Sequence, residues 1–472
     1  MLHLSQESDR ETWRAIVLRQ QGAEVLLTAT VSGFRLPSLE IPRWRRLAEQ
    51  LTSAMKAEWG CDAICLAVLN GSTAHDGCEP TRYAVMEFWS DTRSATDRAE
   101  WIPGTSVGPQ AFEDNQDYLA LRQALEQCSK PPAGAAGPFA KPGWFAELRA
   151  WIAEAIRPYG LELRNSFCQF NASPTFSLIR FETSGPAVWF KAVGEPNLRE
   201  FTLTPILAKL FAGSIPHIFA ARSAWNAWLA WDVEGASLGD SREVEHWKSA
   251  ATAFANVQIA SISYGRELLQ SGARDLRLPA ISESIGPFFA VMAHLMERQS
   301  QCPPAILGHA ELLCLEKQLK SAFSLVADLR IPDTLGHPDL NPENVLRTRQ
   351  GWTFLDWAQA FVGFGCVSFE YFLEHFRHAV EADAAVEAEI RECYWKPWRA
   401  VIPSVRLTEL QRAAPLLAVF AYAVQSGFWT SNQKVSEGKA AGYLRSLTRR
   451  MKLEADQFSA HRATSALHVP KR

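Results

Sequence analysis

The stretch that most constrains this 472-residue chain runs from Leu335 to Trp357 and reads LGHPDLNPENVLRTRQGWTFLDW. Asp339 is followed five residues later by Asn344, and Asp356 comes twelve residues after that, behind a short apolar run. The segments on either side of the turn RTRQG predict a β-hairpin that brings Asn344 and Asp356 to the same end. Their oxygens could then share a divalent cation, with Asp339 facing the same space.

The types and spacing of these residues suit phosphoryl transfer. Mg²⁺ prefers a few carboxylate or carboxamide oxygens together with phosphate oxygens, and the transfer needs one more carboxylate to orient the attacking hydroxyl. Asn344 and Asp356 would bind the metal, and Asp339 would act on the hydroxyl. The alternative is a polar loop between two strands whose acids are merely solvated, but the whole set at this spacing favours a site.

The same stretch resembles the kinase signature H-R-D-L-x-x-x-N followed by D-F-G. It stands here as HPDLNPEN over residues 337–344 and DWA over 356–358. Pro338 replaces the Arg and no Gly follows Asp356, so the pattern is more similar to the aminoglycoside phosphotransferase and choline kinase branch of the kinase-like fold than to protein kinases. The resemblance implies a two-lobed α+β fold, with Asp339 as the catalytic base and His337 bracing the loop.

The chain upstream offers the other half of such a site. Residues 187–192 (AVWFKA) predict an apolar strand, and Lys191 near its end is costly to bury unless it has a partner and a task. The resemblance implies that Lys191 holds the nucleotide phosphates and that Glu200, opening a predicted helix over 200–211, positions it, with Glu195 as the fallback. The alternative is an ordinary surface lysine on an edge strand.

The loop between two predicted strands, 165–171 and 176–182, lies where protein kinases carry a Gly-rich phosphate loop. It contains no Gly, so the hydroxyls of Ser173 and Thr175 would have to assist a turn in holding the phosphates. An ordinary Pro-containing hairpin loop is the alternative.

A further strand is predicted over 224–232, running into a polar crossover at 233–238. The resemblance places the adenine there, held mainly by backbone groups, and makes Asp232 a nucleotide-binding candidate. After Asp356 the sequence AQAFVGFGCVS runs straight into a predicted helix from Phe369, without the Ala-Pro-Glu that ends the activation segment of protein kinases. A small hydroxylated acceptor is therefore expected in place of a polypeptide.

Four parts of the chain are predicted from composition and pattern. Residues 1–127 form an α/β domain with a hairpin over 12–30, a helix from Ile41 to Gly60 with Pro42 in its first turn, strands at 62–70 and 83–89 and a helix near 117–128. Residues 128–144 form a Pro/Gly/Ala-rich linker, 145–233 a small lobe that begins with a helix over 144–158, and 234–472 a helical large lobe. The linker predicts that the first domain folds independently.

The first helix of that domain weakly resembles a degenerate Nudix motif. Glu58 and Gly60 keep their places, but Ser53, Ala54 and Ala57 stand where the Arg and two Glu should be. One remaining carboxylate cannot assemble a metal site, so no nucleotide hydrolysis is expected. A plain amphipathic helix explains the segment as well.

In the large lobe the pattern predicts a helix beginning at Asp240, where Asp240 and Glu243 would form a capping box. A long helical region is predicted over 369–393, and at least two more helices over 407–450.

Charge and cysteine content exclude several classes of protein. The formal net charge is −3, which does not suggest nucleic-acid or membrane-surface binding. No apolar run approaches ~18 residues, so no membrane span is expected. The nine cysteines are scattered without a C-x-x-C pair, which favours reduced thiols in a cytoplasmic protein and makes a zinc site improbable.

The sequence thus predicts an Mg²⁺-dependent enzyme that moves the γ-phosphoryl group of ATP or GTP to a small molecule. A kinase-like regulatory protein that binds a nucleotide or metabolite is the alternative, and a hydrolase in residues 1–127 is disfavoured by the missing glutamates. An aminoglycoside acceptor would want carboxylates, which Glu343, Glu370, Glu374 and the acidic run 381–392 could supply unless that run is a solvated helix face. Neither the acceptor nor the oligomeric state follows from the sequence.

Overall fold

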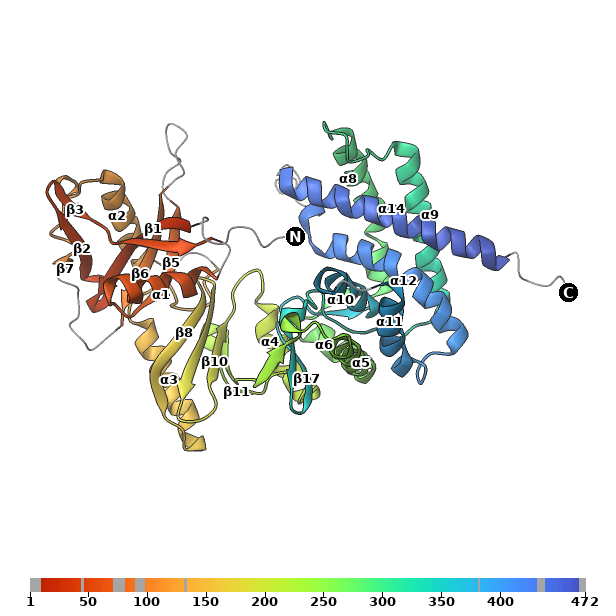
Figure 1. Ribbon diagram of the computed structural model, residues 1–472, viewed down its shortest axis with the longest axis horizontal. Helices are drawn as coiled ribbons and strands as arrows, with labels where there is room; N and C mark the ends of the chain where they lie inside the picture. Colours follow the sequence, from red (N-terminus) through yellow and green to blue (C-terminus); the bar gives the residue numbers. More distant parts are fainter. Residues whose placement is uncertain are drawn as a thin grey trace. The chain divides into compact units, whose positions relative to one another are not determined.

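The computed structural model describes residues 10–43, 46–70, 81–89, 98–130, 134–380, 383–430 and 438–466. Two compact units make up the chain, and we describe each by itself. Unit 1 comprises residues 1–201 and 217–232, and unit 2 comprises residues 202–216 and 233–472. Sheets dominate unit 1 and helices dominate unit 2 (Figure 1). The mixed α+β class predicted from the sequence is confirmed.

The first sheet of unit 1 has the strand order β3-β2-β1-β6-β5, with β4 added beside β1 and β7 beside β2. The predicted hairpin and the two later strands are confirmed, and β1 runs parallel to β6. The elements are β1 (Arg10–Arg19), β2 (Glu24–Thr30), β3 (Gly33–Arg35), β4 (Ser38–Pro42), α1 (Leu47–Trp59), β5 (Ala63–Asn70), β6 (Arg82–Phe88), β7 (Glu100–Pro103) and α2 (Asn115–Ser129).

The predicted start of the first helix is wrong. Pro42 ends strand β4 in register with Arg10 of β1, and the helix begins only at Leu47. Along β4 the side chains of Leu39 and Ile41 are buried and their neighbours are not, and this period of two marks a strand. The predicted end is right, because Gly60 follows the helix with a φ of 63°, which favours glycine.

The second sheet of unit 1 has the order β11-β12-β10-β9-β8, in which the predicted strands are confirmed and β11 is additional. The predicted strand over 224–232 is shorter, because residues 223–225 form a 3₁₀ turn. The elements are α3 (Trp144–Ile156), β8 (Leu163–Ser173), β9 (Phe176–Thr183), β10 (Val188–Ala192), α4 (Arg199–Leu210), β11 (Ile218–Arg222) and β12 (Ala227–Trp231).

The two sheets of unit 1 share one apolar core. Gln169 of β8 is 1% exposed and bonds the backbone of Cys65 in β5 twice, through its Nε2 and its Oε1, each at 2.8 Å. Phe139, inside the Pro-rich stretch, is also buried in this core. The predicted boundary at 128–144 therefore lies within unit 1, and independent folding of residues 1–127 stays a prediction.

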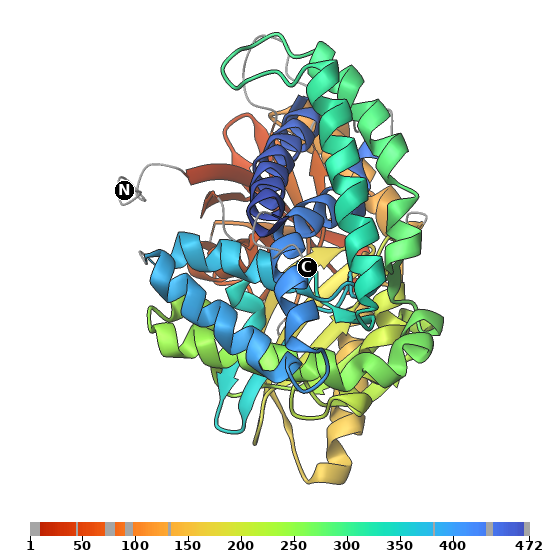
Figure 2. The ribbon, with the colours of Figure 1, turned by 90° about the vertical axis from the view of Figure 1, so that its right-hand side faces the viewer.

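Unit 2 is built from helices around two small three-stranded sheets, β13-β16-β17 and β14-β18-β15. The long helices α9, α12 and α14 pack against one another, as Figures 1 and 2 show. The strands are β13 (Gly235–Ser237), β14 (Arg274–Leu276), β15 (Thr334–Gly336), β16 (Val345–Thr348), β17 (Gly351–Phe354) and β18 (Phe361–Gly363). The helices are α5 (Val244–Ser261), α6 (Gly265–Gln270), α7 (Leu278–Ser282), α8 (Ile285–Glu297), α9 (His309–Leu329), α10 (Cys366–Ala379), α11 (Ala384–Trp398), α12 (Ser404–Gln425) and α14 (Gly438–Ala466).

Two helix predictions in unit 2 need correction. The capping box at Asp240 is wrong, because Asp240 ends a 3₁₀ turn and α5 begins at Val244. The hydroxyls of Ser237 and Ser241 accept the nearby backbone N–H groups of residues 239 and 243, and these local turns compete with a helix start at Asp240.

The helical region predicted over 369–393 consists of two helices, α10 and α11. Asp383 begins the second by accepting the backbone N–H groups of Ala385 and Val386, each at 3.0 Å. The prediction of at least two helices over 407–450 is confirmed by α12 and α14.

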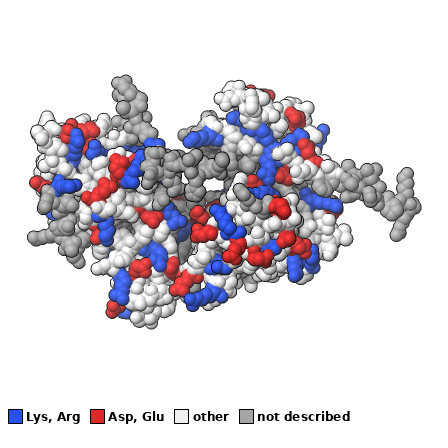
Figure 3. All heavy atoms as spheres, in the orientation of Figure 1, with Lys and Arg blue, Asp and Glu red and all other residues white. Residues whose placement is uncertain are grey.

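One segment of the described chain, Leu278–Glu297, is long and apolar enough to cross a membrane, with a mean hydropathy of 1.2. Its side chains Phe288 and Met292 are fully buried in the core of unit 2. A core helix of a soluble protein passes the same test of length and composition. On the face drawn in Figure 3, described acidic and basic side chains are interspersed on both units.

Glu87 is a partly buried carboxyl near the end of β6. Its Oε1 accepts the backbone N–H of Gly143 at 2.6 Å, while its Oε2 is buried with no hydrogen-bond partner among the described residues. Burial raises the pKa of Glu87 to about 7, against the opposing effect of that hydrogen bond. The folded state therefore holds this proton up to a pH of about 7, whereas the unfolded chain releases it near pH 4.5.

We predict that Glu87 makes unit 1 lose stability as the pH rises from about 4.5 to about 7, where the unfolded chain has released a proton that the folded state still holds. The loss is on the order of 2–3 kcal/mol and levels off above that range. Glu87→Gln removes this slope, because an amide does not titrate. Urea unfolding at pH 5, 6, 7 and 8 measures it. Glu126→Gln, at an exposed position on α2, is the control, and an unchanged slope in Glu87→Gln would refute the assignment.

Candidate active site

The loop after β15 presents Asp339 to solvent between the buried residues Pro338 and Leu340. A 3₁₀ turn, Pro342–Asn344, follows directly. Asn341 caps this turn, since its Oδ1 accepts the backbone N–H groups of Glu343 at 2.9 Å and Asn344 at 3.2 Å. The cap sets the path of the chain from Asp339 to Asn344.

Three donors orient the carboxylate of Asp339. Asn341 Nδ2 and the hydroxyl of Tyr371 both donate to Oδ1, at 3.0 and 3.2 Å, and Asn344 Nδ2 lies 3.4 Å from Oδ2. A carboxylate offers about four lone-pair positions, so an exposed one held in this way can still accept a hydroxyl proton. The arrangement suits a general base.

The hairpin predicted from the sequence is confirmed as β16 and β17, with Val345 opposite Phe354. The backbone N–H of Leu355 donates to the carbonyl of Asn344 at 2.8 Å, so the chain reaches Asp356 at the same end of the hairpin. Asp356 has a φ of 57°. Such left-handed backbone in a residue other than glycine costs of order 1–3 kcal/mol, and among the described residues Gln20, Gln21, Asn226 and Arg330 adopt it too.

The donor set around Asn344 fits a cation that also binds phosphate. The Nδ2 of Asn344 donates to the backbone carbonyl of Asp339 at 3.0 Å. The Oδ1 of Asn344 therefore points away from that carbonyl and can serve as an oxygen ligand. Among the described residues, no three His, Cys, Asp or Glu side chains gather closely enough to hold a metal alone. Asn344 and Asp356 would hold Mg²⁺ only together with ligand oxygens, as is usual for Mg²⁺ on nucleotides.

His337 joins the loop of Asp339 to the loop of Asp356. The residue is fully buried, and its Nε2 donates to the carbonyl of Leu355 at 2.7 Å. Its backbone N–H donates to Ser368 Oγ at 2.8 Å, and its ring lies 4.6 Å from the ring of Trp357. The geometry makes His337 a brace between the two loops.

Unit 1 contains a lysine–glutamate pair. Lys191 Nζ lies 2.5 Å from Glu200 Oε1, and Glu200, in the first turn of α4, is 2% exposed. Strand β10 lies between β9 and β12, which excludes the alternative of a lysine on an edge strand. The partner is Glu200 and not the fallback Glu195. The rings of Phe176 and Trp228 each lie 5.9 Å from the ammonium, so the charge sits in a largely apolar surrounding.

Ser173 and Thr175 lie in the tight turn between β8 and β9, where Ser173 pairs with Phe176. Ser173 Oγ accepts the backbone N–H of Thr175 at 3.2 Å and lies 3.3 Å from its hydroxyl. A Cβ on Gly194 would meet the carbonyl of Thr175 at 2.5 Å, so only glycine allows this turn to approach the chain after Lys191. The turn is thus held beside the end of β10.

The carboxylate of Asp232 is engaged within the sheet. Its Oδ2 accepts Arg180 Nη2 at 2.9 Å, and its Oδ1 accepts the indole N–H of Trp189 at 2.5 Å. The backbone N–H of Asp232 donates to the carbonyl of Ala187 at 2.9 Å. These bonds give the side chain a structural task, and its role as a nucleotide ligand stays a prediction.

Two residues of the site escaped the sequence analysis. Asn341 carries a readable signal, because Asn followed by Pro is typical of a cap with proline in the first position of the turn. Tyr371, on α10, carries none, because its contact with Asp339 spans 32 positions and depends on how α10 packs. The structure brings Asp339, Asn344, Asp356 and His337 together in unit 2, and Lys191 and Glu200 together in unit 1.

Solved structures similar to this chain include a macrolide 2′-phosphotransferase from Brachybacterium faecium, at 15% identity and a TM-score of 0.40 over 64% of this chain and 98% of that one. Choline kinase from Cryptosporidium parvum matches at 11% identity and a TM-score of 0.45, over 67% of this chain and 97% of that one. A spectinomycin phosphotransferase in complex with ADP and spectinomycin matches at 12% identity and a TM-score of 0.38, over 65% of this chain and 98% of that one.

The chain is similar to small-molecule phosphotransferases and choline kinases. These are the proteins that the catalytic stretch resembles in sequence. No family model and no curated protein matches the chain, and nothing in the comparisons supports a Nudix resemblance. Since every TM-score quoted is below 0.5, we derive the function from the residues themselves.

We predict that His337→Ala destabilises unit 2 by about 2–4 kcal/mol, because it removes a buried side chain and leaves the carbonyl of Leu355 without its donor. Thermal and urea unfolding of the whole protein measure the loss. His309→Ala, at an exposed position at the start of α9, should leave stability unchanged. Equal stability of the two variants would show that His337 is no brace.

Proposed function

We propose that the chain is an Mg²⁺-dependent phosphotransferase that moves the γ-phosphoryl group of ATP or GTP to a hydroxyl of a small molecule. The observation that supports this proposal is that Asp356, in left-handed backbone, follows the hairpin end that carries Asn344, and that Asn344 Nδ2 lies 3.4 Å from the exposed carboxylate of Asp339. A base and two oxygen ligands on one rigid loop system are what the in-line transfer needs. The pair of Lys191 and Glu200 supplies the cation for the nucleotide phosphates.

In this proposal Asp339 accepts the proton of the acceptor hydroxyl as its oxygen attacks the γ-phosphorus and the bond to the β-phosphate oxygen breaks. Asn344 and Asp356 hold Mg²⁺, which neutralises charge on the phosphates. Lys191 contacts the phosphates, and the buried carboxylate of Glu200 keeps its ammonium in place. His337 maintains the distance between the two loops and takes no proton.

The tight turn after β8 would take the place of a Gly-rich phosphate loop. We propose that backbone N–H groups there and the hydroxyls of Ser173 and Thr175 contact the phosphates. Asp232 would lie near the nucleobase of ATP or GTP, and the backbone that follows Asp232 would offer the hydrogen bonds to it.

The domain assignment is part of the proposal. Residues 1–127 serve as a non-catalytic domain, 128–144 as a linker, 145–233 as the small lobe and 234–472 as the large lobe. In α1, Glu58 is exposed, as are Ser53 and Ala57, so a single carboxylate faces solvent where a metal-binding set would need several. The eight described cysteines are free thiols, which supports a reducing cytoplasmic location.

A regulatory protein that binds a nucleotide without turnover is the second candidate, and the glycine-free turn favours it. Incubation of the full-length protein with MgATP or MgGTP and a panel of hydroxylated metabolites, with ADP or GDP release as the readout, separates the two. Acceptor-dependent release supports the enzyme. Nucleotide binding without release for any acceptor supports the regulatory protein.

We predict that Asp339→Ala lowers turnover by at least ~10² while nucleotide affinity changes little, because the base contacts the acceptor and not the nucleotide. Steady-state kinetics and nucleotide titration measure the two effects. Glu343→Ala, at an exposed position on the same loop, is the matched control and should retain activity. Near-normal turnover of Asp339→Ala would show that another group is the base.

We predict that Asp356→Asn and Asn344→Ala both raise the Mg²⁺ concentration needed for half-maximal activity. The first loss is larger, because Asp356 offers a full negative charge and Asn344 only a dipole. Activity of Asn344→Ala should recover partly at high Mg²⁺. Equal losses that Mg²⁺ does not relieve would contradict a shared metal site.

A further inference from the structure

A cavity of about 650 Å³ opens among α10, α11, α12 and α14 of unit 2. Tyr371, Tyr422 and Tyr443 line it, and we call it the tyrosine pocket. The rings of Tyr371 and Tyr422 stack with centroids 5.1 Å apart, and Tyr443 stands edge-on to Tyr422 at 6.5 Å. The volume is typical of sites for small organic molecules and larger than a compact ion needs.

Tyr371 connects the tyrosine pocket to Asp339. Its ring lines the cavity, and its hydroxyl donates to Asp339 Oδ1. Burial, reinforced by Tyr422 and Asp339, raises the pKa of Tyr371 above its ordinary value, so the phenol stays a donor. Asp339 is not itself a lining residue, and Tyr371 is the side chain that links the pocket lining to the carboxylate that would take a hydroxyl proton.

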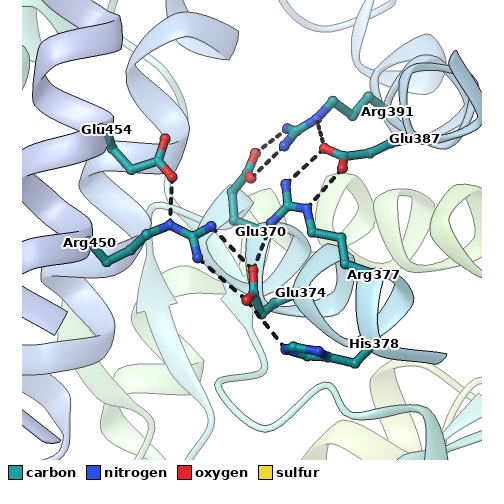
Figure 4. A network of polar contacts seen from close by, with 8 residues as sticks. All are labelled: Glu370, Glu374, Arg377, His378, Glu387, Arg391, Arg450 and Glu454. Carbon is teal, nitrogen blue, oxygen red and sulfur yellow. Dashed lines mark hydrogen bonds and ion pairs between the residues drawn. The ribbon is translucent and has the colours of Figure 1, made fainter. Parts of the chain in front are cut away.

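The pocket wall carries four carboxylates, and each one is bonded to an arginine (Figure 4). Both oxygens of Glu370 accept from Arg391, at 2.5 and 2.9 Å, and Glu370 is 8% exposed. Glu387 accepts from Arg391 at 3.0 Å and from Arg377 at 2.8 Å. These bonds join α10 to α11.

The remaining two carboxylates are bonded in the same way. Arg450 of α14 lies between Glu374, at 3.2 Å, and Glu454, at 2.8 Å. Glu374 also accepts from Arg377 at 2.7 Å, and His378 lies 3.5 Å from it. Four acids thus face three arginines in one continuous network.

This pairing changes what the pocket can attract. A polycation would have to take a carboxylate from an arginine and leave that guanidinium without its partner in a partly buried site, which costs more than the new contact returns. Of the acids that could suit an aminoglycoside, Glu370 and Glu374 are bonded to arginines, Glu343 is exposed on the loop of Asp339, and residues 381–382 of the acidic run lie outside the described part. An anion would likewise have to take an arginine from a carboxylate and leave that carboxylate without its partner.

The rest of the pocket is apolar. Leu453 is 60% exposed and Tyr443 is 38% exposed, and both lie at its lining together with Val419 and Leu447. Large apolar side chains left open beside a cavity of this size are typical of a surface that a ligand covers. Apart from Gln457, the lining among the described residues consists of apolar and aromatic side chains and of the arginine–glutamate network, in which each of the four carboxylates is bonded to one of three arginines and one negative charge is left over.

We propose that the tyrosine pocket binds the acceptor, and that the acceptor is a hydroxylated molecule without net charge that carries an aromatic or other flat apolar ring, such as a neutral glycoside. The proposal rests on the proposed function for its reaction, but not for its binding. The ring packs on Tyr371, Tyr422 and Leu453. The hydroxyl groups bond to the outer N–H groups and oxygens of the arginine–glutamate network, which reach the ligand without any loss of ion pairing.

Two matched probes test the choice of ligand without nucleotide: phenyl β-D-glucoside, which is neutral, and its 4-aminomethyl derivative, which adds one positive charge. Isothermal titration of the full-length protein should show the neutral glucoside binding at least about tenfold more tightly. Tyr422→Ala should weaken its binding by about tenfold or more. No binding of the neutral probe up to about 10 mM, equal or tighter binding of the cation, or binding unchanged in Tyr422→Ala would each overturn the proposal.

A charge-unbalancing variant tests the reason for the choice. Arg450→Gln removes the arginine bonded to Glu454 and leaves Arg377 as the only arginine bonded to Glu374, so the cationic probe should gain at least about fivefold in affinity relative to the neutral one. Arg399→Gln is the control, because Arg399 pairs with Glu392 outside the pocket lining and should change neither affinity. A ratio of affinities that Arg450→Gln leaves unchanged would overturn the electrostatic argument; if that variant does not fold, the two probes on the natural protein decide.

Failure of the proposed function would look different. A protein that binds the neutral glucoside through Tyr422 but releases no ADP with any acceptor keeps this pocket and loses the enzyme assignment. A protein that phosphorylates only polycationic acceptors keeps the enzyme assignment and loses the pocket's proposed ligand class.

Discussion

The hydrogen bond from buried His337 to the carbonyl of Leu355 is the contact on which the candidate site in unit 2 depends. It ties the loop that presents Asp339 to the strand end that presents Asp356. Asp356 adopts backbone that costs free energy unless its surroundings enforce it. The exposed groups that could do chemistry are thus supported by a buried one that does none.

Two buried carboxylates of the molecule follow the same rule, because each has a cation close by. Glu200 is buried because Lys191 lies beside it, and Glu370 is buried because Arg391 binds both of its oxygens. In the first pair a single ammonium stays near an apolar wall, where phosphate could reach it. In the second pair the charges of Glu370 and Arg391 cancel, so the pocket around them selects a ligand by shape and hydrogen bonding.

Much of the fold could be predicted from local pattern. The hairpin of β16 and β17 and the strand of Lys191 follow from short-range spacing, which acts over a few residues, whereas the pairing of Lys191 with Glu200 is implied by the family resemblance. The errors arose where two local signals compete. Pro42 suits the first turn of a helix and also the end of a strand. Pairing with β1 places it in the strand. At Asp240 the neighbouring serines captured the backbone groups that a helix cap would have used.

The sequence by itself determined which groups can do chemistry here: Asp339, Asn344 and Asp356 stand close together in the chain, and a turn of fixed geometry is enough to gather them. Only the tertiary structure decided what lies around them. Tyr371 reaches Asp339 from α10, and two of the acids that could have supplied an anionic cleft, Glu370 and Glu374, are bonded to arginines of α10, α11 and α14. Ion pairs between helices depend on how those helices pack, and no spacing along the chain encodes the sum of charges on a wall that three helices share.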